Sequence, residues 1–143
     1  LVRLGRRAGT RRDAVLRVAE ACERVGTKLS LFIEANVEQI RASREVGARQ
    51  IEIHTGHYCE DPTEKHAEWI QRFAIAARAA HELGLEVAAG HGLNVDNVAP
   101  VATLDHMAEL NIGHSIICDA VFVGLPTAVQ RMRAAVDAAV ARG

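Results

Sequence analysis

The stretch REVGARQIEIHTG, residues 44–56, decides the fold expected for this chain. Gly47 ends a helical segment, and QIEIH, residues 50–54, then has the length and composition of a strand. The same order of helix, glycine, short linker and strand recurs in ERVGTKLSLFI at 23–33 and HELGLEVAAG at 81–90. Strands that alternate with helices form a parallel sheet through right-handed crossovers. The repeat therefore predicts an α/β protein.

The pattern continues on both sides of this repeat. Asp13 is the expected N-cap of the first helix, and Asp61-Pro62 marks the start of a long one. SIICDAVFVG, residues 115–124, fits either a short helix or a further apolar strand. The predicted strands are 28–33, 50–54, 85–90 and 109–114. The predicted helices are 13–25, 37–46, about 62–83, 94–101 and one opened by Pro126.

The composition is that of one globular domain with a buried core. Of the 143 residues, 49% are hydrophobic and 24% charged, which argues against disorder. No run approaches the roughly 20 apolar residues of a membrane span, and no secretory leader is recognised. Cys22, Cys59 and Cys118 form no CxxC pair, which indicates a reducing compartment. We expect a cytoplasmic protein that does not bind membranes.

The charge is distributed unevenly. Residues 1–12 hold five arginines and no acid, so residues 13–143 carry −6, because the whole chain carries −1 and this head +5. The acidic body makes nucleic acid an unexpected partner. A nucleic-acid arm and an organelle presequence are alternatives for the head. We favour a loose tail or a truncation scar outside the fold, because the head has no aromatic residue and no amphipathic stripe.

In parallel α/β sheets the functional residues lie at the carboxyl ends of the strands. Near one such end, Glu52 and His54 share a face of their strand, whereas Ile51 and Ile53 share the other. A buried parallel strand is normally apolar on both faces, and a buried glutamate is rare unless it is paired or functional. We favour a functional role for Glu52 over a structural pair, and leave the role of His54 open.

The next strand end carries Gly90-His91-Gly92. The glycines permit a tight turn and a close approach of the backbone to a ligand. A histidine held there is suited to donate or accept a proton near neutral pH. The alternative is a turn histidine that caps the next helix.

The last predicted strand ends in NIGHS, residues 111–115. If a helix begins near His114, then Gly113 and His114 lie at its positive N-terminus, which favours an anion such as phosphate. The alternative is an ordinary strand-to-helix turn. We therefore expect phosphorylated small molecules as ligands.

Other chemistries receive less support. His57, Cys59 and Asp61 lie in one loop, but their spacing matches no established zinc pattern, so no metal site is predicted. The sequence has no Walker loop, no GxGxxG and no nucleophile elbow. No lysine lies at the four strand ends, which disfavours a Schiff-base aldolase.

Four motifs resemble one enzyme family, pyridoxine 5′-phosphate synthase, from about Asp13 to the end of the chain. They are LSLFIEA at 29–35, IEIHTG at 51–56, AGHGLN at 89–94 and ELNIGHSII at 109–117. The resemblance implies a (β/α)8 barrel, of which this chain would be the C-terminal half with about four parallel strands. It also implies condensation of 1-deoxy-D-xylulose 5-phosphate with 3-amino-1-hydroxyacetone 1-phosphate, without a metal or organic cofactor.

The resemblance also implies roles for individual residues. His91 matches the family's proton donor, and Glu52 matches a carboxylate that stabilises the transition state. Gly92, Gly113 and His114 match the binding site for the aminoketone phosphate. The products would be pyridoxine 5′-phosphate, inorganic phosphate and water.

The chain also departs from the family. No segment matches its other catalytic histidine, its proton-accepting glutamate or its phosphate-binding arginine. Cys118-Asp119 replaces a Gly-Arg pair, which is expected to weaken anion binding. We therefore expect little or no turnover by this chain alone, and a homo-oligomer. The alternative is a non-catalytic half-barrel that binds phosphate ligands and dimerises.

Overall fold

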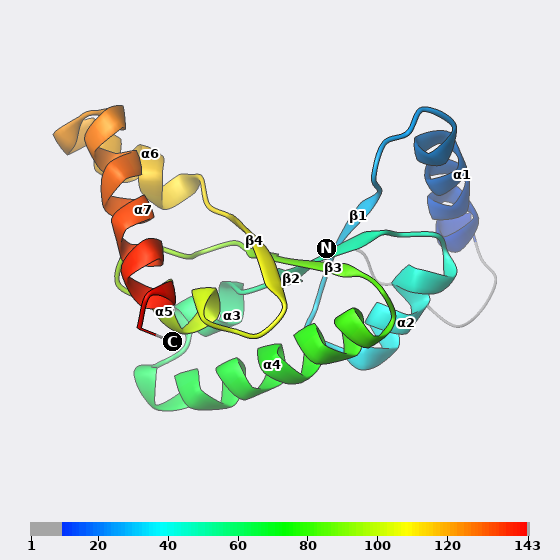
Figure 1. The fold of residues 1–143 in the computed structure, drawn as a ribbon, viewed down its shortest axis with the longest axis horizontal. Coiled ribbons are helices and arrows are strands. Elements are labelled where there is room, and N and C mark those ends of the chain that lie inside the picture. Colours follow the sequence, from blue (N-terminus) through cyan, green and yellow to red (C-terminus); the bar gives the residue numbers. More distant parts are fainter. Residues whose placement is uncertain (1–9, 143) are drawn as a thin grey trace.

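The computed structural model describes residues 10–142 (Figure 1). Four short strands alternate with helices along the chain. The strands are β1 (Ser30–Ile33), β2 (Gln50–His54), β3 (Glu86–Gly90) and β4 (Met107–Asn111). The helices are α1 (Thr10–Arg24), α2 (Val37–Glu45), α3 (Gly56–Glu60), the 3-10 turn η1 (Thr63–Lys65), α4 (His66–Glu82), α5 (Ala99–Ala102), α6 (His114–Val123) and α7 (Leu125–Val140).

The strands form one sheet in the order β1-β2-β3-β4, and every neighbouring pair is parallel. This arrangement confirms the predicted α/β class and is consistent with part of a (β/α)8 barrel. Because the strands run in the same direction, their carboxyl ends and the loops that follow lie along one edge of the sheet. The expected site residues are therefore brought to that edge.

One face of the sheet carries the core. Along the register, Ile33 pairs with Ile53 and Ile53 with Ala89, and all three side chains are buried. Helices α2 and α4 cover this face, so that the buried residues of α4 pack against the strands (Figure 1). Those residues are Phe73, Ala76, Ala77 and Ala80, whereas Trp69, near the start of the helix, is only half-buried.

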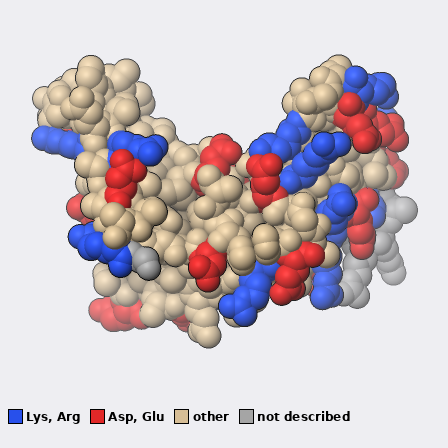
Figure 2. Space-filling view, in the orientation of Figure 1, with Lys and Arg blue, Asp and Glu red and all other residues tan. Residues whose placement is uncertain are grey.

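The opposite face is polar and open. Phe32 pairs with Glu52, and His54 pairs with Gly90, which in turn pairs with Asn111. These side chains lie on the side of the sheet away from α4. Figure 2 shows the molecule hollowed between two raised ends, which Figure 1 identifies as α1 and the pair α6 and α7. In a closed barrel this face would line the interior.

Several element boundaries differ from the predictions. Asp13 is not an N-cap, because α1 begins at Thr10 and Asp13 lies in its first turn, where a carboxylate still favours the positive helix end. Residues 1–9 of the predicted basic head lie outside the described residues, and residues 10–12 belong to α1. Arg12 reaches from this helix to Glu45 of α2 at 3.0 Å.

Local side-chain hydrogen bonds explain two further differences. The predicted helix at 94–101 shrinks to α5, because Asn94 Oδ1 accepts hydrogen bonds from the backbone N–H groups of Asp96 and Asn97 at 2.9 and 3.2 Å. The helix predicted from Pro62 begins later, at His66, because Pro62 is extended (ψ 149°) and the Trp69 indole binds the Asp61 carboxylate at 2.9 Å.

The remaining segments resolve the open alternatives. TGHYCE contains the short helix α3, where only turns were expected. All of SIICDAVFVG except its final Gly124 lies in the helix α6, so the segment is not a strand. Pro126 lies in the first turn of α7, as predicted. Strand β4 begins two residues earlier than predicted, directly after His106, whose backbone has a positive φ of 68°.

Within the described residues, no helix has the length and apolar character needed to cross a membrane.

The core face predicts a contrast between two isoleucines. Ile53→Ala removes a side chain with 0% exposure and should lower the free energy of unfolding by about 2–5 kcal/mol. Ile75→Ala removes the same atoms from a side chain that is 55% exposed on α4. This variant should change the free energy of unfolding by about 0.5 kcal/mol or less. Urea denaturation followed by circular dichroism measures both values. Equal losses in the two variants would contradict this account of the core.

Candidate active site at the carboxyl ends of the strands

A cavity of about 680 Å³ opens at the carboxyl ends of the strands. It is bounded by residues from β1, β2 and β4 and by the loops after β3 and β4. Every one of the residues singled out from the sequence as catalytic or substrate-binding lines it: Glu52, His91, Gly92, Gly113 and His114. The roles of these residues remain predictions, but the structure places them around one space large enough for a small ligand.

The side chain of Glu52 reaches from β2 across the sheet to β4. Its Oε2 accepts a hydrogen bond from Asn111 Nδ2 at 2.9 Å, so the pair joins β2 to β4 above β3. The space beneath the pair exists because β3 has Gly90 there. A Cβ at that position would collide with Glu52 Oε1 and would lie 2.8 Å from the Asn111 carbonyl oxygen. Gly90 is thus required for the carboxylate to reach over the middle of the sheet.

His91 has an unusual backbone conformation. Its φ is 81°, in the left-handed region that residues other than glycine rarely occupy, at a typical cost of about 1–3 kcal/mol. The buried Thr55 hydroxyl lies 2.7 Å from both the Gly90 and the His91 carbonyl oxygens, and the Thr55 N–H donates to Gly90 O at 2.9 Å. These bonds hold the turn so that the exposed imidazole lines the cavity. Such strain concentrates at functional sites.

Gly92 continues the same turn with a φ of 86°. A Cβ here would lie 2.8 Å from the Cβ of Cys59 on α3, so the turn packs directly against that helix. Burial raises the pKa of the Cys59 thiol, which therefore stays protonated and packs as a small neutral group. Gly92 thus provides the tight turn expected of the glycines of GHG, and its close approach to a ligand stays a prediction.

The N-terminus of α6 forms the opposite side of the cavity. Gly113 precedes the helix and has no side-chain cap, and His114 and Ser115 form its first turn. The Ser115 hydroxyl donates to the Leu93 carbonyl at 2.7 Å and so ties this helix end to the loop that carries His91. The free N–H groups and the positive end of the helix dipole make this position suitable for an anion.

The two residues that depart from the family motif lie further along α6. The Asp119 carboxylate accepts hydrogen bonds from Arg131 of α7 at 3.1 and 3.3 Å, so its charge is already paired. The Cys118 thiol lies 3.6 Å from His114 Nε2. This ion pair reduces the repulsion that Asp119 was expected to exert on an anion. It does not supply the arginine that the family motif has at this position.

His54 lies beside the cavity rather than on its wall. Its ring centroid is 4.9 Å from that of His91 and 5.1 Å from that of Phe32, which it meets edge-on. Burial lowers the pKa of His54, although the neighbouring Glu34 charge acts in the opposite direction. The lowered pKa favours the neutral form of His54, and its ring packs against that of His91. Gly56 leaves room for both rings, because a Cβ there would lie 2.7 Å from His54 Nε2 and 2.9 Å from His91 Cδ2.

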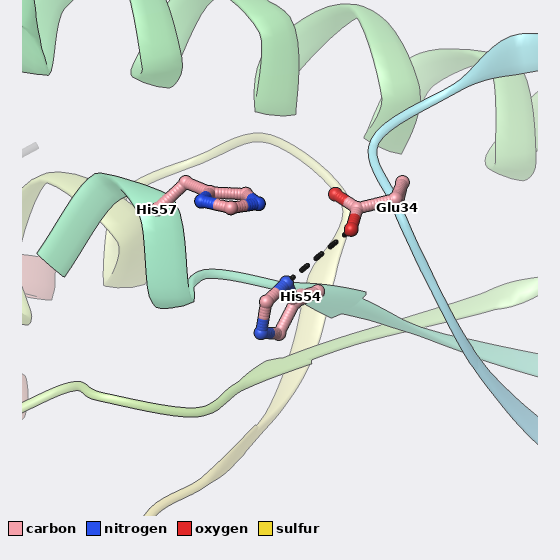
Figure 3. Close-up of side chains that lie close together, drawn as sticks. All are labelled: Glu34, His54 and His57. Carbon is pink, nitrogen blue, oxygen red and sulfur yellow. Dashed lines mark ion pairs between the residues drawn. The ribbon is translucent and has the colours of Figure 1, made fainter. Parts of the chain in front are cut away.

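The structure does not bring together His57, Cys59 and Asp61, the loop residues for which no metal site was predicted. His57 points toward Glu34 and His54 (Figure 3), Cys59 packs on Gly92, and Asp61 binds Trp69.

Sequence reasoning missed Asn111, Phe32 and Ser115, which also line the cavity. Each of them reaches the cavity from a different segment, and Asn111 and Ser115 contact residues far away in the sequence. A motif within one segment therefore cannot predict their place in the site. The only available signal was that Asn111 and Ser115 lie at the two ends of NIGHS, at the same strand end as Gly113 and His114.

Comparison with known proteins identifies the family. The family model described as pyridoxal phosphate biosynthesis protein PdxJ matches residues 4–138. A pyridoxine 5′-phosphate synthase of Caulobacter sp. (strain K31) is 48% identical over 131 residues, which cover 89% of this chain and 52% of the relative. The enzyme of the same name from Jannaschia sp. (strain CCS1) is 50% identical over 119 residues, 80% of this chain and 48% of the relative.

A third relative of that name, from Zymomonas mobilis, is 48% identical over 80% of this chain and 44% of its own length. The chain thus spans about half the length of the curated relatives it matches. The family model covers nearly all of the chain, including every strand and all of the residues that line the cavity. The chain therefore belongs to the PdxJ family of pyridoxal phosphate biosynthesis proteins.

Proposed function

We propose that this chain supplies one half of the active site of a pyridoxine 5′-phosphate synthase. The reaction would join 1-deoxy-D-xylulose 5-phosphate to 3-amino-1-hydroxyacetone 1-phosphate and release phosphate and water. The observation that supports it is the convergence of Glu52, His91 and the N-terminus of α6 on one cavity, in a chain that belongs to the PdxJ family. A carboxylate, an imidazole and an anion site are the groups that such a condensation needs.

The arrangement suggests how the work is divided. The backbone N–H groups at Gly113 and His114 would hold the phosphate of the aminoketone, which fixes its amine relative to the carbonyl of the second substrate. Formation of the carbon–nitrogen double bond expels a hydroxyl group as water, and His91 would donate the proton that makes it a leaving group. The Glu52 carboxylate, oriented by Asn111, would stabilise the positive charge of the iminium intermediate.

The rest of the site would come from outside this chain. The family's second catalytic histidine, its proton-accepting glutamate and its arginine have no counterpart in the sequence. The polar face of the sheet is open where a closed barrel would continue (Figure 2). We therefore propose that the chain alone binds phosphate but turns over weakly or not at all. The enzyme to which it contributes would be homo-oligomeric and cytoplasmic.

The role of His91 can be tested in a chimera in which this chain replaces the aligned segment of the Caulobacter relative. The chimera should form pyridoxine 5′-phosphate from both substrates, and His91→Asn should lower kcat by about 10²–10⁴-fold because the proton donor is lost. His81→Asn, in an exposed histidine that stacks on His106, is the matched control and should retain activity.

A rise in KM with kcat unchanged in His91→Asn would make His91 a binding residue instead. An inactive chimera in which inorganic phosphate still binds the chain would favour the non-catalytic alternative.

The hydrogen bond between Asn111 and Glu52 predicts a positioning effect. In the chimera, Asn111→Ala should lower kcat by about 10–150-fold, the equivalent of the 1.5–3 kcal/mol of a hydrogen bond to a charged group, with a smaller change in KM. Glu109→Ala is the control, because it removes a comparable bond from Gln50 to Glu109 (2.9 Å) two residues earlier on β4. Equal losses in the two variants would show a general effect on the sheet instead of a positioned carboxylate.

The anion site can be tested on this chain with inorganic phosphate. Gly113→Val places a branched side chain over the first N–H groups of α6 and should weaken phosphate binding by about tenfold or more in calorimetric titration, a loss of about 1.4 kcal/mol. Thr127→Val puts the same side chain at the N-terminus of the neighbouring helix α7 and should leave the affinity unchanged. Unchanged affinity in Gly113→Val would exclude this site.

A further inference from the structure

Three side chains from different segments converge beside the cavity (Figure 3). Glu34 follows β1, His54 ends β2, and His57 lies on α3. One donor atom from each, a carboxylate oxygen and two imidazole nitrogens, lies within 4.8 Å of the others. The close-up shows the carboxylate directed into the space between the two rings. The three residues are separated along the chain, so only the pairing of β1 with β2 and the turn into α3 bring them together.

The Nδ1 atom of His54 is the unusual feature of this group. It is buried and has no hydrogen-bond partner among the described residues. Glu34 Oε1 lies 3.6 Å away, which is too long for a hydrogen bond. Buried polar side-chain atoms are nearly always partnered, so an unpartnered one is a candidate ligand for a water or an ion. The orphaned atom faces the carboxylate and the second imidazole.

We propose that Glu34, His54 and His57 bind a divalent transition-metal ion of the Zn²⁺ class. Two imidazoles and one carboxylate are a common ligand set for zinc, with a fourth position left for water or another ligand. Bonds of about 2.0–2.2 Å at tetrahedral angles place ligand atoms about 3.4 Å apart. The 3.6 Å between His54 Nδ1 and Glu34 Oε1 is close to that spacing. The His57 donor atom lies within 4.8 Å of the other two and has to move closer to complete the set.

The geometry fits a shared metal better than a direct hydrogen bond between His54 and Glu34. Their nearest atoms are 3.6 Å apart, and a donor atom of His57 lies within 4.8 Å of both residues' donor atoms. Imidazole nitrogens and carboxylate oxygens are both zinc ligands. Phe32 meets the His54 ring edge-on at 5.1 Å and Trp69 stacks on the His57 ring at 5.7 Å, so aromatic neighbours support both rings.

This site goes beyond the proposed condensation, which needs no metal. It lies next to the proposed active site, because the ring of His54 is 4.9 Å from that of His91. Glu34, His54 and His57 have no assigned role in the reaction, so metal binding can be tested separately from activity.

The test uses the 143-residue chain, freed of metal with a chelator, and Co²⁺ as a spectroscopic probe for the Zn²⁺ class. We expect one Co²⁺ per chain with the intense visible absorption of four-coordinate Co²⁺, and displacement of that signal by Zn²⁺. Glu34→Gln and His57→Asn should each weaken binding by at least about tenfold. The first is isosteric and the second alters an exposed side chain, so both should fold, as circular dichroism can verify. His54→Asn should abolish the visible absorption.

His81→Asn is the control and should bind Co²⁺ like the unaltered chain. Three results would overturn the proposal. The first is no stoichiometric binding of Co²⁺ or Zn²⁺ by the folded chain. The second is unchanged affinity in Glu34→Gln and His57→Asn. The third is a sulfur-to-cobalt charge-transfer band, which would assign the ion to a cysteine such as Cys118, beside His114 on α6.

Discussion

The parallel pairing of four strands in chain order is the constraint on which the rest of the structure depends. It brings the carboxyl end of every strand to one edge of the sheet, so segments far apart in the sequence become neighbours. It also gives the sheet two distinct faces. Ile33, Ile53 and Ala89 form a continuous apolar layer under the helices, and Phe32, Glu52 and Asn111 lie on the open side. The candidate site is formed where the open face reaches the loops.

Much of this architecture could be predicted from the sequence, because its causes are local. The helix, glycine and strand repeat fixes the element order, and the alternation in IEIH separates a core face from a polar face. Gly90 and Gly92 were expected to permit a tight turn and a close approach of the backbone to a ligand. The structure shows tight packing at both positions, against Glu52 and Asn111 at Gly90 and against Cys59 at Gly92. The predicted strand ends therefore coincide with the lining of the cavity.

What the sequence did not reveal depends on contacts between segments. The bond from Asn111 to Glu52 requires β2 and β4 to lie on either side of β3, with a glycine between them. The left-handed backbone of His91 depends on Thr55, which lies in another loop. The group of Glu34, His54 and His57 likewise forms only when β1 pairs with β2. None of these relations has a fixed spacing that a pattern could detect.

We propose that Glu52 and His91, which line one cavity, act together on the same step of the condensation. The most direct measurement is kcat for the double variant Glu52→Gln/His91→Asn in the chimera, beside the two single variants. Groups that act as a unit give strongly non-additive losses, so the double variant should be little slower than the more damaged single variant. If the two losses multiplied in full, the residues would act independently, and the account of a single shared site would be contradicted.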